Sequence, residues 1–203
     1  MTNIPHGGKL VNLIVEPERA KDLQKLSRNL ESITLTSRQL SDLELIMNGT
    51  FSPLRGFMTS EEYNSVRDNM RLQDGTLWPI PICLDISEDH AKALKPGQSV
   101  ALRDAEGFMV AVLTIEDIWS PDKSLEADQV YGTRDTAHPG VDYLFSQTGT
   151  HYVGGAIEGI QFPLHFAFRR LRHTPAEIRA LYRKLGWRRI VGFHTRNPLH
   201  RVQ

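Results

Sequence analysis

Three short apolar runs between residues 70 and 120 constrain the fold more than any other feature of the sequence. They cover residues 79–84, 99–103 and 108–115, and turn sequences such as Asp74-Gly75 and Lys95-Pro96-Gly97 bound them. Because no long helix lies between the runs, they favour an antiparallel, barrel-like sheet over βαβ units. We therefore expect an α+β domain with a β core.

Amphipathic helices are expected on the N-terminal side of these strands. Between residues 17 and 30, for example, apolar positions recur at three- and four-residue steps with charged residues between them. Capping residues and Asn-Gly stops give the limits of the others. A short strand is expected over 10–15, and helices are expected over 17–30 and 37–47, the second with a cap at Thr36 or Ser37. Another helix is expected to begin at Ser60, and an irregular section after Trp119 is expected to return in part to the sheet.

The pattern changes again at Thr174-Pro175-Ala176-Glu177, which has the capping threonine, first-turn proline and third-position glutamate of a helix start. The apolar residues that follow predict a buried stripe, and Gly186 predicts the end of the helix. Residues 190–193 then form a short apolar run typical of the first parallel strand of an α/β domain. We expect a domain boundary near residues 168–174. The predicted stripe consists of Ile178, Leu181, Tyr182 and Leu185.

Charge is balanced over the whole chain but not along it. Lysine plus arginine and aspartate plus glutamate number 24 each, which argues against a surface that binds nucleic acid or anionic membrane as a whole. Basic residues crowd the segment from 169 to 203, so an anion site is expected there. They are Arg169, Arg170, Arg172, Arg179, Arg183, Lys184, Arg188, Arg189, Arg196 and Arg201.

Cysteine content and the N-terminus bear on the cellular compartment. Cys83 is the only cysteine, which excludes an intrachain disulfide and thiolate zinc sites, and its apolar neighbours predict a small buried residue. The first residues lack the basic start and apolar stretch of a secretory signal, and no window approaches the ~20 apolar residues of a membrane span. A soluble, cytoplasmic protein is expected.

The segment from His194 to His200 carries the most informative chemistry. It follows the predicted strand at 190–193, and loops at the carboxyl ends of parallel strands are where α/β folds bind ligands. Arg196 offers a planar fork to a tetrahedral oxyanion, and Thr195 and Asn197 can donate to phosphate oxygens. His200 can supply a proton or a cation beside a phosphoanhydride. An ordinary solvated turn has the same composition, and the residues alone do not separate the two interpretations.

A resemblance to a known family does separate them. ATP sulfurylases carry the motif Gln-x-Arg-Asn-Pro-x-His-x-x-His, and residues 195–201 resemble its middle. His194 stands where glutamine is usual and Gln203 where the second histidine is expected. The rest of the chain is similar to the family almost throughout. The similar segments are residues 5–8, 49–58, 138–141, 154–161, 171–177 and 186–191.

The resemblance to ATP sulfurylases implies a fold and a reaction. The implied fold is a PUA-like, β-barrel-containing N-terminal domain over residues 1–170, followed by the incomplete start of a Rossmann-like α/β nucleotidyltransferase domain over 171–203. Family members join ATP and sulfate into adenosine 5′-phosphosulfate and pyrophosphate. The missing part of that domain leads us to expect no activity from the chain alone, and residues 174–203 to be poorly ordered or packed against another surface.

Site residues carry over from the family by position. The catalytic set is Thr195, Arg196, Asn197 and His200, with His194, Arg196 and Asn197 holding substrate; His194 in place of glutamine makes pH-sensitive binding an expectation. Magnesium is expected with ATP, held by phosphate oxygens and water rather than by a dedicated protein site. The full-length protein is expected to form a homo-oligomer.

Other polar residues have structural interpretations. Asp85, Glu88 and Asp89 are predicted to cap a helix, and His138, His151 and His165 to be structural or loop residues. Gly154-Gly155 lacks the lysine and serine of a P-loop. A second functional hypothesis is a PUA-like binding or oligomerisation module, including one for RNA. Neutral charge and few aromatic residues weaken the RNA version, and RNA binding without pyrophosphate release would support it.

Overall fold

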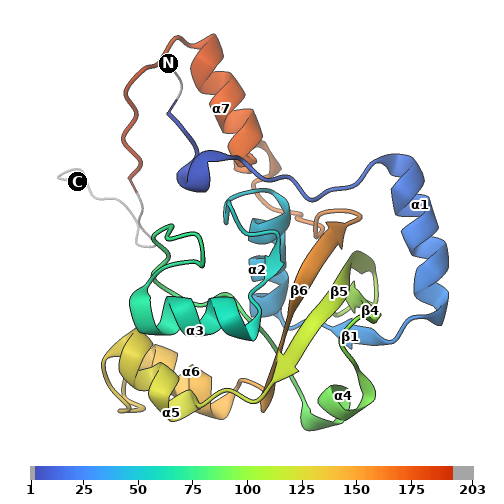
Figure 1. Cartoon of the computed structure of the whole chain (residues 1–203). Helices are drawn as coiled ribbons and strands as arrows, with labels where there is room; N and C mark the ends of the chain where they lie inside the picture. The colour runs from blue at the N-terminus through green and yellow to red at the C-terminus, as the bar shows by residue number, and fades with distance from the viewer. Residues whose placement is uncertain (1–2, 194–203) are drawn as a thin grey trace.

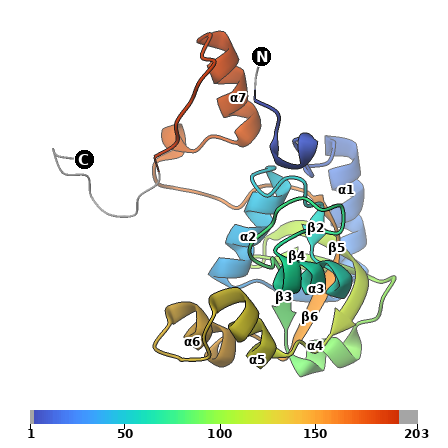
Figure 2. The same cartoon turned by 60° about the vertical axis from the view of Figure 1, so that its left-hand side comes forward.

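The strands form one six-stranded sheet in the order β1-β4-β5-β6-β2, with β3 pairing on β6 (Figures 1 and 2). The structure is a computed structural model, and it describes residues 3–193. β1 pairs with β4 in parallel, and the other pairs are antiparallel, so the predicted α+β class with a β core is confirmed. The strands are β1 (Ser32–Thr34), β2 (Gly56–Phe57), β3 (Leu84–Ile86), β4 (Ser99–Arg103), β5 (Met109–Trp119) and β6 (His151–Gly159).

The long antiparallel pair of β5 and β6 is the centre of the sheet. Its register runs from Ala111 opposite Gly159 to Trp119 opposite Tyr152, with an irregularity between Ile115 and Asp117. The other edge of β6 is shared, because β3 pairs with its first half and β2 with its second half. β6 therefore holds three strands that are far apart in the sequence.

Two glycines allow β6 to approach its neighbours closely. A Cβ atom on Gly154 would lie 2.2 Å from the Met58 carbonyl oxygen, and one on Gly155 would lie 2.0 Å from the Thr114 carbonyl oxygen. Gly155 also has a φ of 154°, at the edge of the region that favours glycine. The sequence interpretation that this pair does not form a P-loop agrees with their place inside a strand.

Local signals place the helices on the N-terminal side. Thr36, one of the two predicted caps, caps α2, and the structure adds a complete capping box with Gln39. The apolar run at 10–15 forms only a single bridge, between Ile14 and Gly159, instead of the predicted strand. The helices are α1 (Pro17–Leu26), continued by a 3₁₀ turn at Ser27–Asn29, then α2 (Ser37–Met47), α3 (Ser60–Asn69) and α4 (Glu88–Ala93), with a further 3₁₀ turn at His6–Gly8.

The predicted strand at 79–84 begins later than expected. Only Leu84–Ile86 enters the sheet, because Pro79 and Pro81 lack the amide hydrogens that a ladder needs. In contrast, the predicted strands at 99–103 and 108–115 are confirmed, and the second extends to Trp119. The turn prediction at Asp74-Gly75 is confirmed by a left-handed Gly75 and a hydrogen bond from its amide to the Leu72 carbonyl.

The section between β5 and β6 is a small helical insert, so its description as irregular is wrong, although its return to the sheet as β6 is confirmed. It contains α5 (Lys123–Glu126), a π-helical turn (Ala127–Tyr131) and α6 (Pro139–Ser146). Each helix is short, which leaves too few turns for a periodic pattern to show in the sequence. Ala127, Val141 and Leu144 form a separate cluster inside the insert.

A buried carboxyl group fastens the insert to the sheet. Oε2 of Glu126 accepts hydrogen bonds from the hydroxyls of Tyr63 on α3 and Tyr152 on β6, each 3.0 Å long. Burial raises the pKa of Glu126, and the hydrogen bonds and nearby cations oppose that shift. The guanidinium of Arg38 adds a second link, since it lies 4.5 Å from the centre of the Tyr143 ring.

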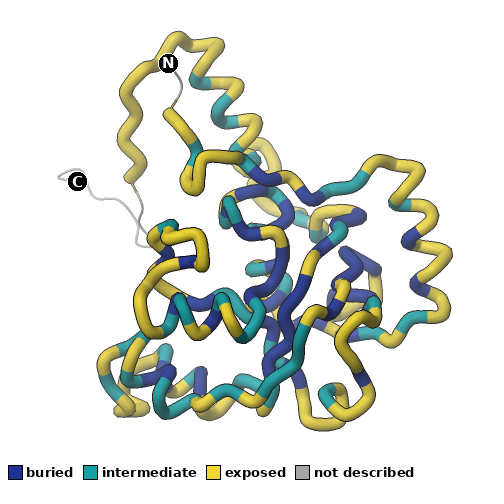
Figure 3. The backbone as a smooth tube through the Cα atoms, in the orientation of Figure 1, coloured by how far each residue is buried: buried dark blue, intermediate teal, exposed yellow. Residues whose placement is uncertain are grey.

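The main core lies between α2 and the sheet. Leu43, Ile46 and Met47 pack against buried residues of β4, β5 and β6. A second cluster under α3 contains Tyr63 and Trp78. Figure 3 shows how the buried positions follow the strands and the inner side of α2, while most of the surface helices are exposed.

The C-terminal part departs from expectation in two ways. Helix α7 (Pro175–Lys184) is confirmed with its predicted capping box, but it buries none of its residues (Figure 3). Residues 190–193 form no strand among the described residues, and Val191 is 94% exposed. A parallel strand needs a paired neighbour, and none of the described strands pairs with this segment. A 3₁₀ turn at Arg169–Leu171 precedes α7.

Gly154→Ala is expected to destabilise the protein, because the new methyl group would overlap the Met58 carbonyl oxygen 2.2 Å away. Overpacking of this kind costs about 1–3 kcal/mol. Gly192→Ala is the matched control, since nothing lies within 4 Å of the corresponding Cβ. Urea unfolding monitored by tryptophan fluorescence measures both, and equal midpoints for the two variants would contradict the close-approach argument.

Glu126→Gln is expected to change how stability depends on pH. A carboxyl group whose folded pKa is raised binds its proton more tightly in the folded state, so stability falls as pH rises from about 4.3 through the folded pKa. The amide cannot ionise and should remove this loss while still accepting from the tyrosines. Urea unfolding from pH 4 to 8 tests it, with the exposed Glu106→Gln as control; parallel curves for Glu126→Gln and the unchanged protein would refute it.

Candidate functional site

The predicted substrate-binding segment lies outside the described residues. His194, Thr195, Arg196, Asn197 and His200 all fall beyond residue 193, so their mutual geometry stays a prediction. What the structure describes is the approach to this segment, namely α7, the linker before it and the residues 185–193 after it. It also describes several cavities among residues 3–193, and their charges bear on where two anions can bind.

Helix α7 is capped at both ends by residues within it or next to it in the sequence. Oγ1 of Thr174 accepts from the Glu177 amide at 3.3 Å, and Oε2 of Glu177 accepts from the Thr174 amide at 2.7 Å. This backbone hydrogen bond holds the pKa of Glu177 below its usual value. At the other end the Trp187 amide donates to the Tyr182 carbonyl and the left-handed Gly186 donates to Arg183, which is a Schellman motif.

The Schellman motif also fixes the side chains at this end. The rings of Tyr182 and Trp187 stack with centroids 5.8 Å apart. This is the contact between the third-last helical residue and the residue after the glycine that accompanies such motifs. The path by which the chain leaves α7 toward residue 194 is therefore set locally, by residues 182–187.

A few polar contacts join α7 and the segment between β6 and α7 to the sheet domain, which is the part of the chain from residue 3 to the end of β6. Nε2 of His165 lies 2.8 and 2.9 Å from the two carboxylate oxygens of Glu44 on α2. This pair forms part of the wall of a groove of about 430 Å³ between α2 and the start of α7. Arg179 on α7 donates to the backbone carbonyl of Asn3. The interpretation of His165 as a structural residue agrees with this contact.

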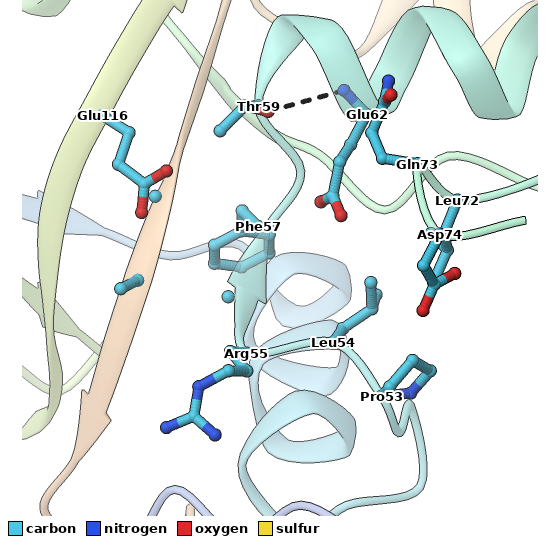
Figure 4. A pocket seen from close by; sticks show the side chains of 13 residues that line it. Pro53, Leu54, Arg55, Phe57, Thr59, Glu62, Leu72, Gln73, Asp74 and Glu116 are labelled. Atoms are coloured by element: carbon cyan, nitrogen blue, oxygen red, sulfur yellow. Dashed lines mark hydrogen bonds between the residues drawn. The ribbon is translucent and has the colours of Figure 1, made fainter. Parts of the chain in front are cut away.

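A second cavity, of about 450 Å³, lies between β2, α3 and the hairpin at residues 70–78 (Figure 4). One guanidinium and three carboxylates line it, and Figure 4 shows the Glu62 side chain directed into the space. Burial raises the pKa of Glu62, and the negative charges of Glu116 and Asp74 add to the shift. The charged lining residues are Arg55, Glu62, Asp74 and Glu116.

This charge balance does not suit two anionic ligands. A cavity that already holds three carboxylates repels phosphate and sulfate, and Arg55 alone does not reverse the sign. No local pattern predicts this cavity, because its charged residues come from four separate segments. The region with an excess of positive charge remains α7 and the residues after it, among which Arg183, Lys184, Arg188 and Arg189 are exposed.

Three smaller predictions about polar residues can be compared with the structure. Glu88 and Asp89 do lie in the first turn of α4, but Ser87 provides the cap, and Asp85 accepts instead from the side chain of Gln39 and the Gly149 amide. The prediction that Asp85 caps a helix is therefore wrong: its strand position turns it toward α2. His138 caps α6 through Nδ1, which agrees with a structural role.

The remaining observations concern cysteine, metals and membranes. Cys83 packs beside the cluster under α3, and burial raises the pKa of its thiol well above the usual value. Within residues 3–193, no group of histidine, cysteine, aspartate or glutamate side chains is arranged to hold a metal ion. None of the described helices has both the length and the apolar character to cross a membrane.

Comparison with protein families divides the chain into two parts. Residues 3–162 match the family described as PUA-like domain, which is well over half of the chain. Residues 169–203 match the ATP-sulfurylase family, so this second match contains the whole predicted substrate-binding segment.

Curated relatives match the chain from end to end. Sulfate adenylyltransferase of Aspergillus fumigatus is 50% identical over 207 residues, which cover 100% of this chain and 36% of that protein. The enzymes of the same name from Mycosarcoma maydis and Saccharomyces cerevisiae are 46% and 44% identical, with 36% and 39% of their lengths covered. The chain thus spans little more than a third of the length of these relatives.

One solved structure agrees with the fold over nearly the same span. It is described as hexameric APS kinase from Thiobacillus denitrificans, and it superposes with a TM-score of 0.78 at 37% identity, over 97% of this chain and 34% of that one. The resemblance to ATP sulfurylases drawn from the sequence is confirmed by these matches. The chain therefore belongs to the PUA-like domain family over residues 3–162 and continues into the start of the ATP-sulfurylase family at residues 169–203.

Proposed function

We propose that this chain is the N-terminal part of a sulfate adenylyltransferase, which converts ATP and sulfate into adenosine 5′-phosphosulfate and pyrophosphate. The observation that carries the proposal is the end-to-end match to sulfate adenylyltransferases, at 44–50% identity in the three relatives compared above. The ATP-sulfurylase match at 169–203 supports it, because that family takes over where the chain becomes basic. The PUA-like domain supplies a folded platform, and the reaction belongs to the part that begins at α7.

The proposed chemistry is the approach of two anions. A sulfate oxygen attacks the α-phosphorus of ATP, the bond from that phosphorus to the bridging oxygen breaks, and pyrophosphate leaves with its electron pair. No covalent enzyme intermediate is required, so catalysis consists of positioning and charge stabilisation. In this proposal Arg196 holds sulfate, Thr195 and Asn197 donate to sulfate and the α-phosphate, and His200 stabilises the phosphates. His194 completes the substrate-binding set.

The described structure contributes the electrostatic setting for this proposal. The exposed basic residues at the end of α7 give the approach to residue 194 a positive potential, which attracts phosphate and sulfate. The carboxylate-lined cavity of the sheet domain provides no competing anion site. The capping box and Schellman motif hold α7 as a unit, so the direction in which the chain leaves it is fixed before substrate binds.

The remaining parts of the proposal concern partners and compartment. Magnesium accompanies ATP, bound by phosphate oxygens and water rather than by a protein cage. The complete protein forms a homo-oligomer, for which the hexameric description of the structural relative is the support. A cytoplasmic location fits a metabolic enzyme that uses ATP and sulfate. The domain limits at 1–170 and 171–203 belong to the same proposal.

The chain alone and a longer version should differ in activity. The longer version fuses residues 1–203 to the part of the Aspergillus fumigatus relative that follows its match to this chain. We expect sulfate-dependent pyrophosphate release from ATP by this chimera and none by the chain alone. Pyrophosphate release by neither protein, together with tight RNA binding by the chain, would instead support a binding module.

Arg196→Ala in the chimera is expected to lower sulfate-dependent kcat by at least ~10²-fold, the usual effect of removing a donor to developing charge. Arg28→Ala is the control, because Arg28 is exposed beside α1 and far along the chain from the motif. Steady-state assays with sulfate and with molybdate measure both. Unchanged turnover by Arg196→Ala, with a cooperative unfolding transition, would remove Arg196 from the mechanism.

A further inference from the structure

An apolar groove on the sheet domain has no role in the site described above. It encloses about 510 Å³, and its lining is almost free of polar groups. Leu77 is 53% exposed and Ile80 is 48% exposed, so two of its large aliphatic lining residues are open to solvent. The groove is formed by His6, Phe51, Leu77, Trp78, Pro79, Ile80 and Ile82.

Hydrogen bonds on both sides make the groove a preformed surface. The Trp78 amide donates a hydrogen bond to the Met70 carbonyl at 2.8 Å, which closes the hairpin that carries the groove. The Met58 amide donates to the Ile82 carbonyl at 3.0 Å, which fixes the other end. Trp78 lines the groove, is buried, and meets Phe51 edge to face with ring centroids 5.9 Å apart. A surface held in this way loses little entropy when a partner binds.

The N-terminal segment joins the groove to the start of the ATP-sulfurylase match. Nε2 of His6 lies 2.8 Å from the Leu77 carbonyl oxygen, and a Cβ on Gly7 would meet the ring of Pro53 at 2.6 Å. A few residues earlier, the Asn3 carbonyl accepts from Arg179 on α7. Residues 3–8 therefore touch both parts, and α7 lies beside the N-terminal segment in both views (Figures 1 and 2).

The segment that follows the sheet domain carries unusually many exposed apolar side chains. Phe166 is 89% exposed, and Leu164 and Phe168 on either side of it are also open to solvent. Such a concentration on a soluble protein marks a surface that another structure covers. The exposed set from residue 164 onward includes Leu164, Phe166, Phe168, Leu171, Leu181, Leu185, Trp187, Ile190, Val191 and Phe193.

We propose that the apolar groove is the docking surface for the remainder of the ATP-sulfurylase region, the part that the relatives contain beyond their match to this chain. The inference rests on the proposed function. Its support is the position of the groove, tied through residues 3–8 to the first helix of that region, and the covered length of the relatives, 36–39% in the three compared above. The occupant presents an aliphatic or aromatic segment to Leu77 and Ile80.

Other occupants fit the groove less well. Its lining carries no lysine or arginine to neutralise phosphates, which argues against nucleic acid. The exposed apolar residues between 164 and 193 form a second surface that no other described part of the chain covers. Docking of the following region accounts for both surfaces, because that region continues directly from the second of them.

Cysteine labelling of the chain alone and of the chimera tests the proposal. Leu77→Cys and Ile80→Cys report on the groove, and Phe108→Cys, exposed in the turn before β5, is the matched control. The rate of thiol alkylation at each position is read by peptide mass spectrometry, with the unsubstituted chain as the blank for Cys83. We expect labelling at 77 and 80 to be about tenfold slower in the chimera, and labelling at 108 to be unchanged.

A second measurement does not depend on cysteine chemistry. Ile80→Asp should lower the Tm of the chimera by about 2–4 °C and leave the chain alone unaffected, whereas Phe108→Asp should leave both unaffected. Equal labelling at 77 and 80 in the two proteins would overturn the proposal, because the sheet domain has its own core and exposes the groove unless something docks there. If alkylation at 77 and 80 in the chain alone became slower as the protein concentration rose, the groove would be assigned to a second copy of the chain. That result would also overturn the proposal.

The outcomes separate this inference from the proposed function. Slow labelling at 77 and 80 in a chimera that releases no pyrophosphate would uphold the docking surface and reject the proposed reaction. Pyrophosphate release by a chimera whose groove labels as fast as in the chain alone would uphold the reaction and reject the docking surface.

Discussion

The close approach of β6 to the backbones on both of its sides is the constraint on which the fold depends. At Gly154 and Gly155 there is room for hydrogen atoms only, since the carbonyl oxygens of Met58 and Thr114 occupy the space of any side chain. β6 can therefore pair with β5 along one edge while β2 and β3 share the other. Any larger residue here would separate the strands and open the core between α2 and the sheet.

The elements with local signals were predictable from the sequence, and the extent and pairing of β6 were not. α2 and α7 begin at capping boxes, which are read directly from a threonine followed three residues later by glutamine or glutamate. β6 has no comparable signal, because the glycines that make it central are the residues that strands usually avoid. Its identity as a strand depends on the carbonyl groups that face it from Met58 and Thr114, which no local pattern contains.

For the candidate site, the sequence predicted functional residues where they follow one another in a single segment. The motif from His194 to His200 is continuous, so its residue types and its family resemblance could be recognised without coordinates. The apolar groove and the carboxylate-lined cavity could not, because each is assembled from distant segments. His6 reaches Leu77, and Glu62 faces Glu116, only after the hairpin and the sheet have formed. Tertiary structure creates these surfaces, and sequence spacing does not encode them.

The hydrogen bond between Arg179 and the Asn3 carbonyl brings the beginning of the chain to the helix that leads into the substrate-binding segment. Anything fused to the start of the chain would consequently be attached a few residues from Asn3, the residue that contacts α7. An affinity tag or fluorescent protein attached there would compete with the neighbouring parts for space and charge. Purification schemes that need the surroundings of α7 undisturbed should therefore carry the affinity tag in an exposed loop such as the turn at Glu106, which joins β4 to β5.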